Sequence, residues 1–261
     1  LSADENIRRM CFLPQALLRD DFSKIFNVVF GENAVTKRTI LERLSERPLT
    51  VAEIAEALGV ERSGTISGHL EDLETAGFVA EDAGLVPGSD RTPKLTRYRV
   101  CDNYTRFFLK YIEPHEDEIR AGRYPFTSLS ELPGWRSTLG FQFENMVVNN
   151  VKALFPLFHL EGQHILSAAP FSQKSRNGDE KGLQVDLLIQ TQRTALLVEI
   201  KNRYKIKSDI ESEIKEKLRR FPKQRSISLR TALVYDGELA PSVIRSGVFD
   251  LIVPFSTLLK R

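Results

Sequence analysis

Hydrophobic residues recur every three to four positions along the first 30 residues, which is the spacing of one helix face. Pro14 interrupts this pattern, because proline lacks the amide hydrogen that a helix interior needs. The apolar face resumes at Phe22 and continues to Gly31. We therefore expect a helical segment over residues 1–30.

The next stretch, residues 31–103, combines three short amphipathic segments with two β-like runs. Thr50 is a typical helix N-cap, and Gly59 is a typical helix stop. We expect the elements in this order: helices over 37–46, 51–58 and 62–76, then strands over 78–81 and 95–100 around a tip rich in Pro and Gly. This order resembles a winged helix-turn-helix, a fold that implies DNA as a partner.

Candidate DNA contacts lie at the start of the third helix and in the wing. They are polar or basic residues: Arg62, Ser63, Thr65, Ser67, Arg91, Lys94, Arg97 and Arg99. The third helix then becomes acidic, at Glu71, Asp72 and Glu74. Two interpretations stay open: DNA contact by the wing and the helix N-terminus, or a winged helix that serves as a protein-packing or regulatory spacer.

Residues 104–134 are expected to form an aromatic helical connector and a proline-broken linker, which places a domain boundary before Trp135. Helix and strand patterns then alternate over 135–261. The expected elements are a helix over 135–155, strands over 158–168, 183–190 and 195–201, a helix over 208–221, a strand over 231–235, a helix over 241–246 and a strand over 248–253. This order predicts a mixed α/β (α+β) fold, with a β-sheet flanked by helices.

Charged residues interrupt two apolar strands of this last region. Glu199 and Lys201 lie two apart on one strand and so project from the same face. A hairpin about Gln192-Arg193 puts Asp186 opposite Glu199. Two adjacent carboxylates repel each other unless a cation lies between them, and their hard oxygens suit Mg²⁺ or Mn²⁺. The alternative is a structural ion pair between Glu199 and Lys201 at a strand end.

An Asp followed by Glu-x-Lys on the next strand resembles the PD-(D/E)XK nuclease superfamily. The resemblance implies that Asp186 and Glu199 are metal ligands and that Lys201 orients water or stabilises charge. It also implies an auxiliary acid from the preceding helix, for which Glu144 is the candidate. The sequence departs from the superfamily at Val185, where a proline is usual.

The winged helix, aromatic connector and nuclease-like region together resemble the C-terminal part of an archaeal-type AAA-like ATPase family. This implies an ATPase portion of the same polypeptide as a partner and a Mg²⁺-dependent, DNA-acting hydrolase. The alternative is a catalytically silent nucleic-acid-binding or regulatory module. The 261 residues contain no Gly-x-x-x-x-Gly-Lys-Ser/Thr phosphate loop, so we expect neither ATP binding nor ATP hydrolysis by them.

Composition narrows the class of protein further. The chain has two cysteines, no apolar run of membrane-spanning length and no signal-peptide pattern, so we expect a cytoplasmic protein with no membrane partner; an oligomer stays open. The net charge of +2 conceals a basic block over residues 174–230, which has 15 Lys and Arg against 8 Asp and Glu. Some of its lysines and arginines, which include Lys217, Arg219 and Arg220, are expected to form a solvent-exposed helix face. Others are expected to form a basic patch that contacts a nucleic-acid backbone.

Overall fold

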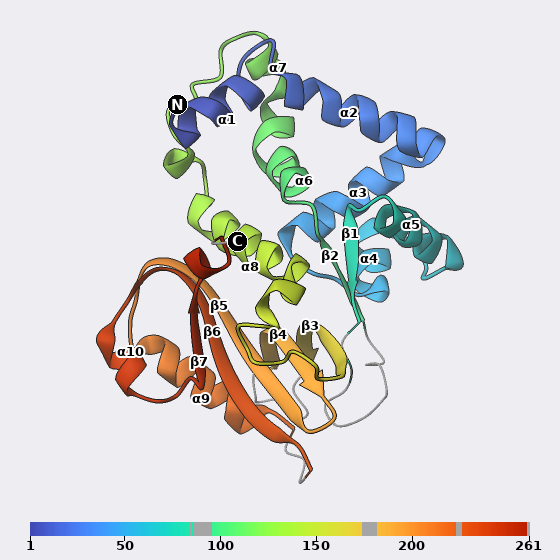
Figure 1. Ribbon diagram of the computed structural model, residues 1–261. Coiled ribbons are helices and arrows are strands. Elements are labelled where there is room, and N and C mark those ends of the chain that lie inside the picture. Colours follow the sequence, from blue (N-terminus) through green and yellow to red (C-terminus); the bar gives the residue numbers. More distant parts are fainter. Residues whose placement is uncertain (84, 86–95, 174–181, 223–225, 260–261) are drawn as a thin grey trace. The chain divides into compact units, whose positions relative to one another are not determined.

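The computed structural model describes all residues except 84, 86–95, 174–181, 223–225 and 260–261 (Figure 1). The wing residues Arg91 and Lys94 therefore lie outside the described part. The chain forms two compact units: Leu1–Glu81 with Arg97–Thr138, and Asp82–Thr96 with Leu139–Arg261. Each unit has its own buried hydrophobic residues.

The first unit contains the expected winged helix-turn-helix. Its elements are α3 (Ala34–Glu46), α4 (Val51–Leu58), α5 (Gly64–Thr75), β1 (Val79–Asp82) and β2 (Arg97–Val100). Thr50 and Glu53 form a capping box at the start of α4, in which each side chain accepts a hydrogen bond from the backbone N–H of the other residue. Gly59 ends α4 in the left-handed conformation that glycine adopts without strain. The predicted winged-helix elements are confirmed.

The helices outside the winged helix share its hydrophobic core. They are α1 (Ala3–Cys11), α2 (Leu17–Phe30), α6 (Asn103–Phe107) and α7 (Glu116–Arg120), with a π-helical stretch over Phe108–Ile112 after α6. Phe26 on α2, Leu70 on α5 and Phe108 are all buried in one cluster. Stacked and edge-on aromatic rings fill this cluster, including Phe22 against Phe108 at 4.2 Å between centroids. The connector residues 104–134 thus contribute core residues to the first unit.

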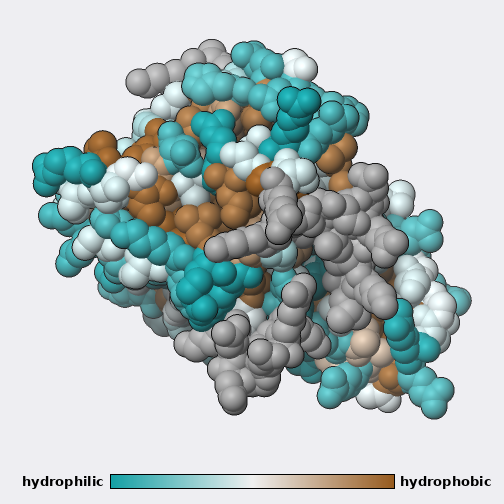
Figure 2. All heavy atoms as spheres, turned by 90° about the horizontal axis from the view of Figure 1, so that it is seen from below, coloured by the Kyte–Doolittle hydropathy of each residue, from teal (hydrophilic) through white to brown (hydrophobic). Residues whose placement is uncertain are grey.

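Helix α2 also carries apolar side chains on its exposed side. Leu17, Ile25 and Val28 are more than half exposed. Figure 2 views the molecule from below, and apolar residues reach the surface on that face as well. In the described part of the chain, no helix combines the length and the apolar composition that a membrane crossing requires.

The second unit is built on a five-stranded sheet with the order β3-β4-β5-β6-β7. The strands are β3 (Ile165–Gln173), β4 (Leu183–Thr191), β5 (Thr194–Ile206), β6 (Ser228–Leu239) and β7 (Leu251–Pro254). The β3–β4 and β4–β5 pairs are antiparallel, whereas β5–β6 and β6–β7 are parallel. The helices of this unit are α8 (Trp135–Asn149), whose first turn belongs to the first unit, α9 (Asp209–Arg220) and α10 (Pro241–Arg245). The predicted mixed sheet with helices is confirmed.

Helices pack on both faces of the sheet, and strand alternation decides which side chains they meet. Phe143 and Val147 of α8 lie in one buried cluster with Val198 of β5. Ile210 and Ile214 of α9 lie in the other, with strand residues such as Leu197. Because residues two apart on a strand share a face, Glu199 projects to the same side as Leu197, which is the α9 face. The α9 face is therefore the one that carries the candidate site.

Several strands differ from the prediction: β6 is longer at both ends than the predicted 231–235, β7 lies three residues later at its start than the predicted 248–253, and β3 and β5 also depart from it. Residues 158–164 form turns instead of the start of a strand, because His159 (φ 55°) and Gly162 (φ 74°) adopt positive φ angles. Strand β5 continues beyond Lys201 to Ile206, although Asn202–Lys205 is polar. A β-bulge in this extension puts two residues, Arg203 and Tyr204, opposite Gly237 of β6.

Candidate functional site

The β4–β5 hairpin brings Asp186 and Glu199 together. Gln190 pairs with Ala195 and Leu187 with Val198, so the hairpin turns at the two residues expected from the sequence. Asp186 and Glu199 follow at the next position along the two strands. Both are buried: 8% of Asp186 and none of Glu199 is exposed. The expected meeting of the two carboxylates is confirmed.

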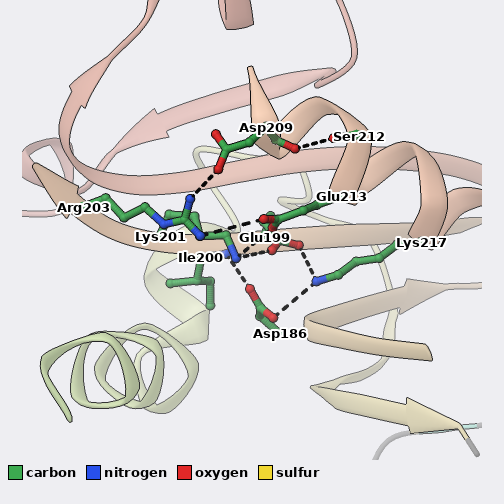
Figure 3. A network of polar contacts seen from close by, with 9 residues as sticks. All are labelled: Asp186, Glu199, Ile200, Lys201, Arg203, Asp209, Ser212, Glu213 and Lys217. Carbon is green, nitrogen blue, oxygen red and sulfur yellow. Dashed lines mark hydrogen bonds and ion pairs between the residues drawn. The ribbon is translucent and has the colours of Figure 1, made fainter. Parts of the chain in front are cut away.

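Each carboxylate has identified partners (Figure 3). Oδ2 of Asp186 accepts a hydrogen bond from the backbone N–H of Ile200 at 2.9 Å. Oε1 of Glu199 forms an ion pair with Nζ of Lys201 at 2.6 Å. Nζ of Lys217, which comes from α9, lies 2.6 Å from Oε2 of Glu199 and 3.5 Å from Oδ1 of Asp186. The ammonium group of Lys217 therefore bridges the two carboxylates.

A second layer of charges surrounds this core (Figure 3). Glu213 of α9 lies 3.3 Å from Nζ of Lys201 and 3.8 Å from Nη2 of Arg203. Arg203 also donates to Asp209 at the start of α9, at 2.9 Å. These outer groups are 39–56% exposed, so solvent screens their contribution to stability. Their main effect is to tie the end of β5 to α9.

Burial and neighbouring charges move the pKa values of the two acids in opposite directions. Burial, followed by the charge of Glu199, raises the pKa of Asp186. Burial also favours the neutral form of Glu199, but the charges of Lys217 and Lys201 outweigh it and lower the pKa of Glu199. Glu199 is thus the more acidic member of the pair.

The two lysines keep their protons more firmly than free lysine does. Burial opposes the charged form of each, but the carboxylates of Glu199 and Asp186 outweigh it, so the pKa values of Lys201 and Lys217 are raised. A protonated amine donates hydrogen bonds and stabilises negative charge, but it does not accept a proton. This environment keeps Lys201 protonated, which suits both of its expected roles, orienting water and stabilising charge, but not the acceptance of a proton.

Glu144, the expected auxiliary acid, lies on α8 beside Phe143, which packs on the face of the sheet opposite α9. Among the described residues, no group of three or more His, Cys, Asp or Glu side chains is positioned to hold a metal ion. Glu144 therefore does not join Asp186 and Glu199 as a third carboxylate. The pair still fits Mg²⁺, because that ion commonly binds through one or two carboxylates and completes its shell with water and substrate phosphate.

Sequence reasoning missed Lys217 and Glu213 as members of the site. Lys217 was expected on a basic surface patch, but it is only 19% exposed. Ile210, Glu213, Ile214 and Lys217 have the i, i+3, i+4, i+7 spacing of one helix face, and both isoleucines are buried. Two charged residues on an apolar face were the signal that marked this site. Elsewhere in the expected patch, Arg219 and Arg220 pair with Glu216.

The winged helix presents the predicted polar residues at the start of α5. Arg62, Ser63, Thr65 and Ser67 are all exposed. The end of α5 is acidic, and its Asp72 forms an ion pair with the buried Lys37 of α3 at 2.7 Å. That pair ties α5 to α3, so Asp72 acts in packing. On α5 itself, the exposed surface suited to a polyanion is therefore the first half of the helix and the residues just before it.

The two described wing arginines differ from this exposed group. Nη1 of Arg97 donates to the carbonyl of Pro48 at 2.9 Å and to Oε2 of Glu53 at 3.1 Å. Arg97 therefore fastens β2 to the start of α4, a role that the prediction of a DNA contact did not include. Arg99, on the same strand, is half-buried.

The winged helix is similar in sequence to a known protein family. Residues 35–81 match the family described as bacterial regulatory protein, arsR family. The match runs from α3 to β1 and covers less than a fifth of the chain. No curated protein matches the chain at a significant level. The winged helix-turn-helix of the first unit is thus similar in sequence to the arsR family.

Several solved structures are similar to parts of the chain. A homodimeric winged helix-turn-helix DNA-binding domain of Mb0332 from Mycobacterium bovis, a possible ArsR-family transcriptional regulator, is 22% identical; the match covers 38% of this chain and 86% of that one, with a TM-score of 0.28. Protein VC1899 from Vibrio cholerae is 14% identical over 92% of this chain, with a TM-score of 0.35. The match spans 53% of VC1899, about half its length. The adhesin competence repressor AdcR from Streptococcus pyogenes is 18% identical, covering 56% of this chain and 96% of that one at a TM-score of 0.26.

Proposed function

We propose that this chain acts on DNA, with a winged helix that binds DNA and an α/β unit that hydrolyses phosphodiester bonds in a Mg²⁺-dependent reaction. One observation carries the hydrolytic part: two buried carboxylates, Asp186 and Glu199, converge on the adjacent apolar strands β4 and β5. Burying such a pair is costly unless cations compensate it. A catalytic role explains why the chain retains both acids there.

The residues that would hold the ion are Asp186 and Glu199, with water and a substrate phosphate completing its coordination. When bound, Mg²⁺ would polarise the phosphoryl oxygen and neutralise the charge that develops on it. The Ile200 N–H fixes the orientation of Asp186, so that carboxylate does not have to be ordered when substrate arrives. Lys201, held by Glu199 and Glu213, supplies a fixed positive charge near the reacting phosphate.

The winged helix would supply the affinity for DNA. The arsR-type family match supports this part, because the members of that family are described as regulatory proteins. The proposed contacts are Arg62, Ser63, Thr65 and Ser67 at the start of α5, together with Arg91, Lys94 and Arg99 of the wing. Helix N-termini and arginines bind phosphate oxygens, and they position the protein without reading sequence.

A second candidate function is a catalytically silent binding or regulatory module, in which the cluster only stabilises the sheet. The observation in its favour is the charge balance: Lys201 and Lys217 already neutralise Asp186 and Glu199 without any metal. A closed network of this kind needs no ion. The two candidates therefore differ in whether the site binds a divalent cation.

The resemblance to an AAA-like ATPase family adds a proposed partner, the ATPase portion of the same polypeptide. The order of winged helix, aromatic connector and mixed sheet supports this proposal. The test measures DNA cleavage with and without ATP by a polypeptide that includes the proposed ATPase portion. If that ATPase controls the hydrolytic site, cleavage will depend on ATP.

Cleavage and metal binding together test the proposed hydrolysis. Wild type is incubated with single-stranded DNA, double-stranded DNA and RNA in Mg²⁺, Mn²⁺ or EDTA, beside Glu199→Ala and Asp186→Ala. The control is Glu238→Ala, which removes an exposed carboxylate from β6 of the same unit. Cleavage that needs the metal, survives in the control and disappears in both site variants supports the proposal. Calorimetry that detects no Mn²⁺ binding by wild type would favour the silent module.

A further inference from the structure

Each carboxylate of the site turns one oxygen toward Lys217 and has its other oxygen engaged elsewhere. Oδ2 of Asp186 accepts the Ile200 N–H, and Oε1 of Glu199 faces Lys201. The remaining oxygens, Oδ1 of Asp186 and Oε2 of Glu199, both face Nζ of Lys217 (Figure 3). The ammonium group thus lies at the point where the two carboxylates can share a cation.

A divalent ion placed between the two acids would meet Oδ1 of Asp186 and Oε2 of Glu199 first, because these are the two oxygens that face a common point. The other two oxygens already serve the Ile200 N–H and Lys201. An ammonium group and a divalent cation also repel each other at such short distances. The ion and the amine of Lys217 therefore compete for one position.

We propose that Lys217 is the built-in counter-cation of the carboxylate pair, which neutralises Asp186 and Glu199 in the metal-free protein and must withdraw when a divalent ion binds. This inference rests on the proposed metal-dependent function and adds to it the residue that sets metal affinity. Lys217 is a positioning residue, since it acts through the two acids.

The surroundings of Lys217 allow this withdrawal. Its side chain is 19% exposed and is therefore not closed off from solvent, unlike the two acids. Glu213 precedes Lys217 by four residues on α9, which puts an acid within reach of the withdrawn amine. Lys201 differs, because it holds Glu199 from the same strand and is also paired with Glu213.

The experiment measures Mn²⁺ affinity by calorimetry on the full chain, in wild type and three variants. Lys217→Met removes the charge and keeps a long, unbranched side chain with good helix propensity. Lys217→Arg keeps the charge. Lys215→Met is the matched control, because Lys215 is an exposed lysine on the same helix.

We expect Lys217→Met to bind Mn²⁺ at least about tenfold more tightly than wild type, since a charged hydrogen bond no longer has to be broken. Lys215→Met and Lys217→Arg should stay within about twofold of wild type or bind more weakly. The inference is overturned if Lys217→Met binds Mn²⁺ no more tightly than wild type does. It is also overturned if Lys217→Arg gains as much Mn²⁺ affinity as Lys217→Met does.

A second measurement covers the case in which Lys217→Met does not fold without metal. Circular dichroism then follows the variant as Mn²⁺ is added, with KCl at equal ionic strength in a parallel sample. Folding that returns with Mn²⁺ alone supports the competition, and no recovery with Mn²⁺ overturns it.

The outcomes also separate this inference from the proposed hydrolysis. If Lys217→Met binds Mn²⁺ more tightly but wild type cleaves no nucleic acid, the competition holds and the hydrolytic function fails. If wild type cleaves in Mg²⁺ but Lys217→Met gains no affinity, hydrolysis holds and the competition fails.

Discussion

Asp186 and Ile200 are linked across the β4–β5 hairpin by a hydrogen bond in which a side chain takes the place of a backbone acceptor. Oδ2 of Asp186 lies 2.9 Å from the Ile200 nitrogen. Asp186 is one residue from Leu187, and Ile200 is two residues beyond Val198, the partner of Leu187. Asp186 therefore has a structural task, satisfying a buried N–H, in addition to its proposed chemical one. Substitutions separate the two tasks.

Asp186→Asn should keep the structural task and lose the chemical one. The amide oxygen can still accept the Ile200 N–H, and the loss of a negative charge relieves repulsion with Glu199. Asp186→Ala leaves the N–H without this acceptor, at a cost of about 1–3 kcal/mol. The free energy of unfolding of the metal-free protein, measured with urea, should therefore be higher for Asp186→Asn than for Asp186→Ala by that amount. Equal stabilities would mean that water or a shifted backbone satisfies Ile200.

The pH dependence of stability should differ between wild type and Asp186→Asn. The raised pKa of Asp186 means that the folded protein holds this proton more tightly than the unfolded chain does. Its stabilising contribution is therefore complete below the unfolded pKa of about 3.9, and it is lost as the pH rises through the folded pKa. Asparagine does not titrate. Urea midpoints measured from about pH 4 to about pH 8 should show wild type losing stability relative to the variant, whereas a constant difference would contradict the shift.

The local patterns predicted much of the fold. Helices α3 to α5 follow from apolar spacing with a capping threonine and a terminating glycine, and the hairpin register follows from a two-residue turn between two apolar runs. The start of β3 was mispredicted because Phe158 and Leu160 alternate with polar residues as a strand does. Nothing in that alternation reveals the positive φ of His159, which turns the chain there.

The strand residues of the candidate site could be predicted from the sequence, but the helix residue Lys217 could not. Asp186, Glu199 and Lys201 lie on two strands joined by a tight turn, so their proximity follows from strand periodicity alone. Lys217, which is 16 residues beyond Lys201, reaches them from α9, and the packing of that helix on the sheet brings it there. Composition suggested a basic surface, whereas the spacing of Ile210 and Ile214 around Lys217 shows that its face is buried.

Arg62 should contribute to DNA affinity mainly through a phosphate. It is exposed immediately before α5, where the helix N-terminus adds positive potential. Arg62→Ala should weaken duplex binding uniformly across sequences and reduce the slope of log affinity against log salt by about one. Fluorescence anisotropy over a series of KCl concentrations measures both quantities. Arg43→Ala, which removes an exposed arginine from α3, is the control, and identical slopes in the two variants would argue against this contact.

Gly237 should be one of the least replaceable residues of the second unit. Its φ is +116°, a value that residues with a side chain rarely adopt, and a Cβ atom there would lie 1.8 Å from the Arg203 carbonyl oxygen. Because that oxygen belongs to backbone, relief requires the bulge in β5 to shift. We expect Gly237→Ala to lower the free energy of unfolding by about 2–3 kcal/mol.

Gly162→Ala is the matched control for this prediction, because Gly162 also has a positive φ, +74°, but an added Cβ would meet nothing within 4 Å. Its cost should be about 1–2 kcal/mol, that of the left-handed conformation alone. Urea unfolding followed by circular dichroism compares the two variants. If they are equally destabilised, the ends of β5 and β6 separate before the rest of the sheet unfolds, and the clash at Gly237 is relieved by local opening. A larger loss in Gly237→Ala means that the bulge unfolds together with the sheet that carries Glu199 and Lys201.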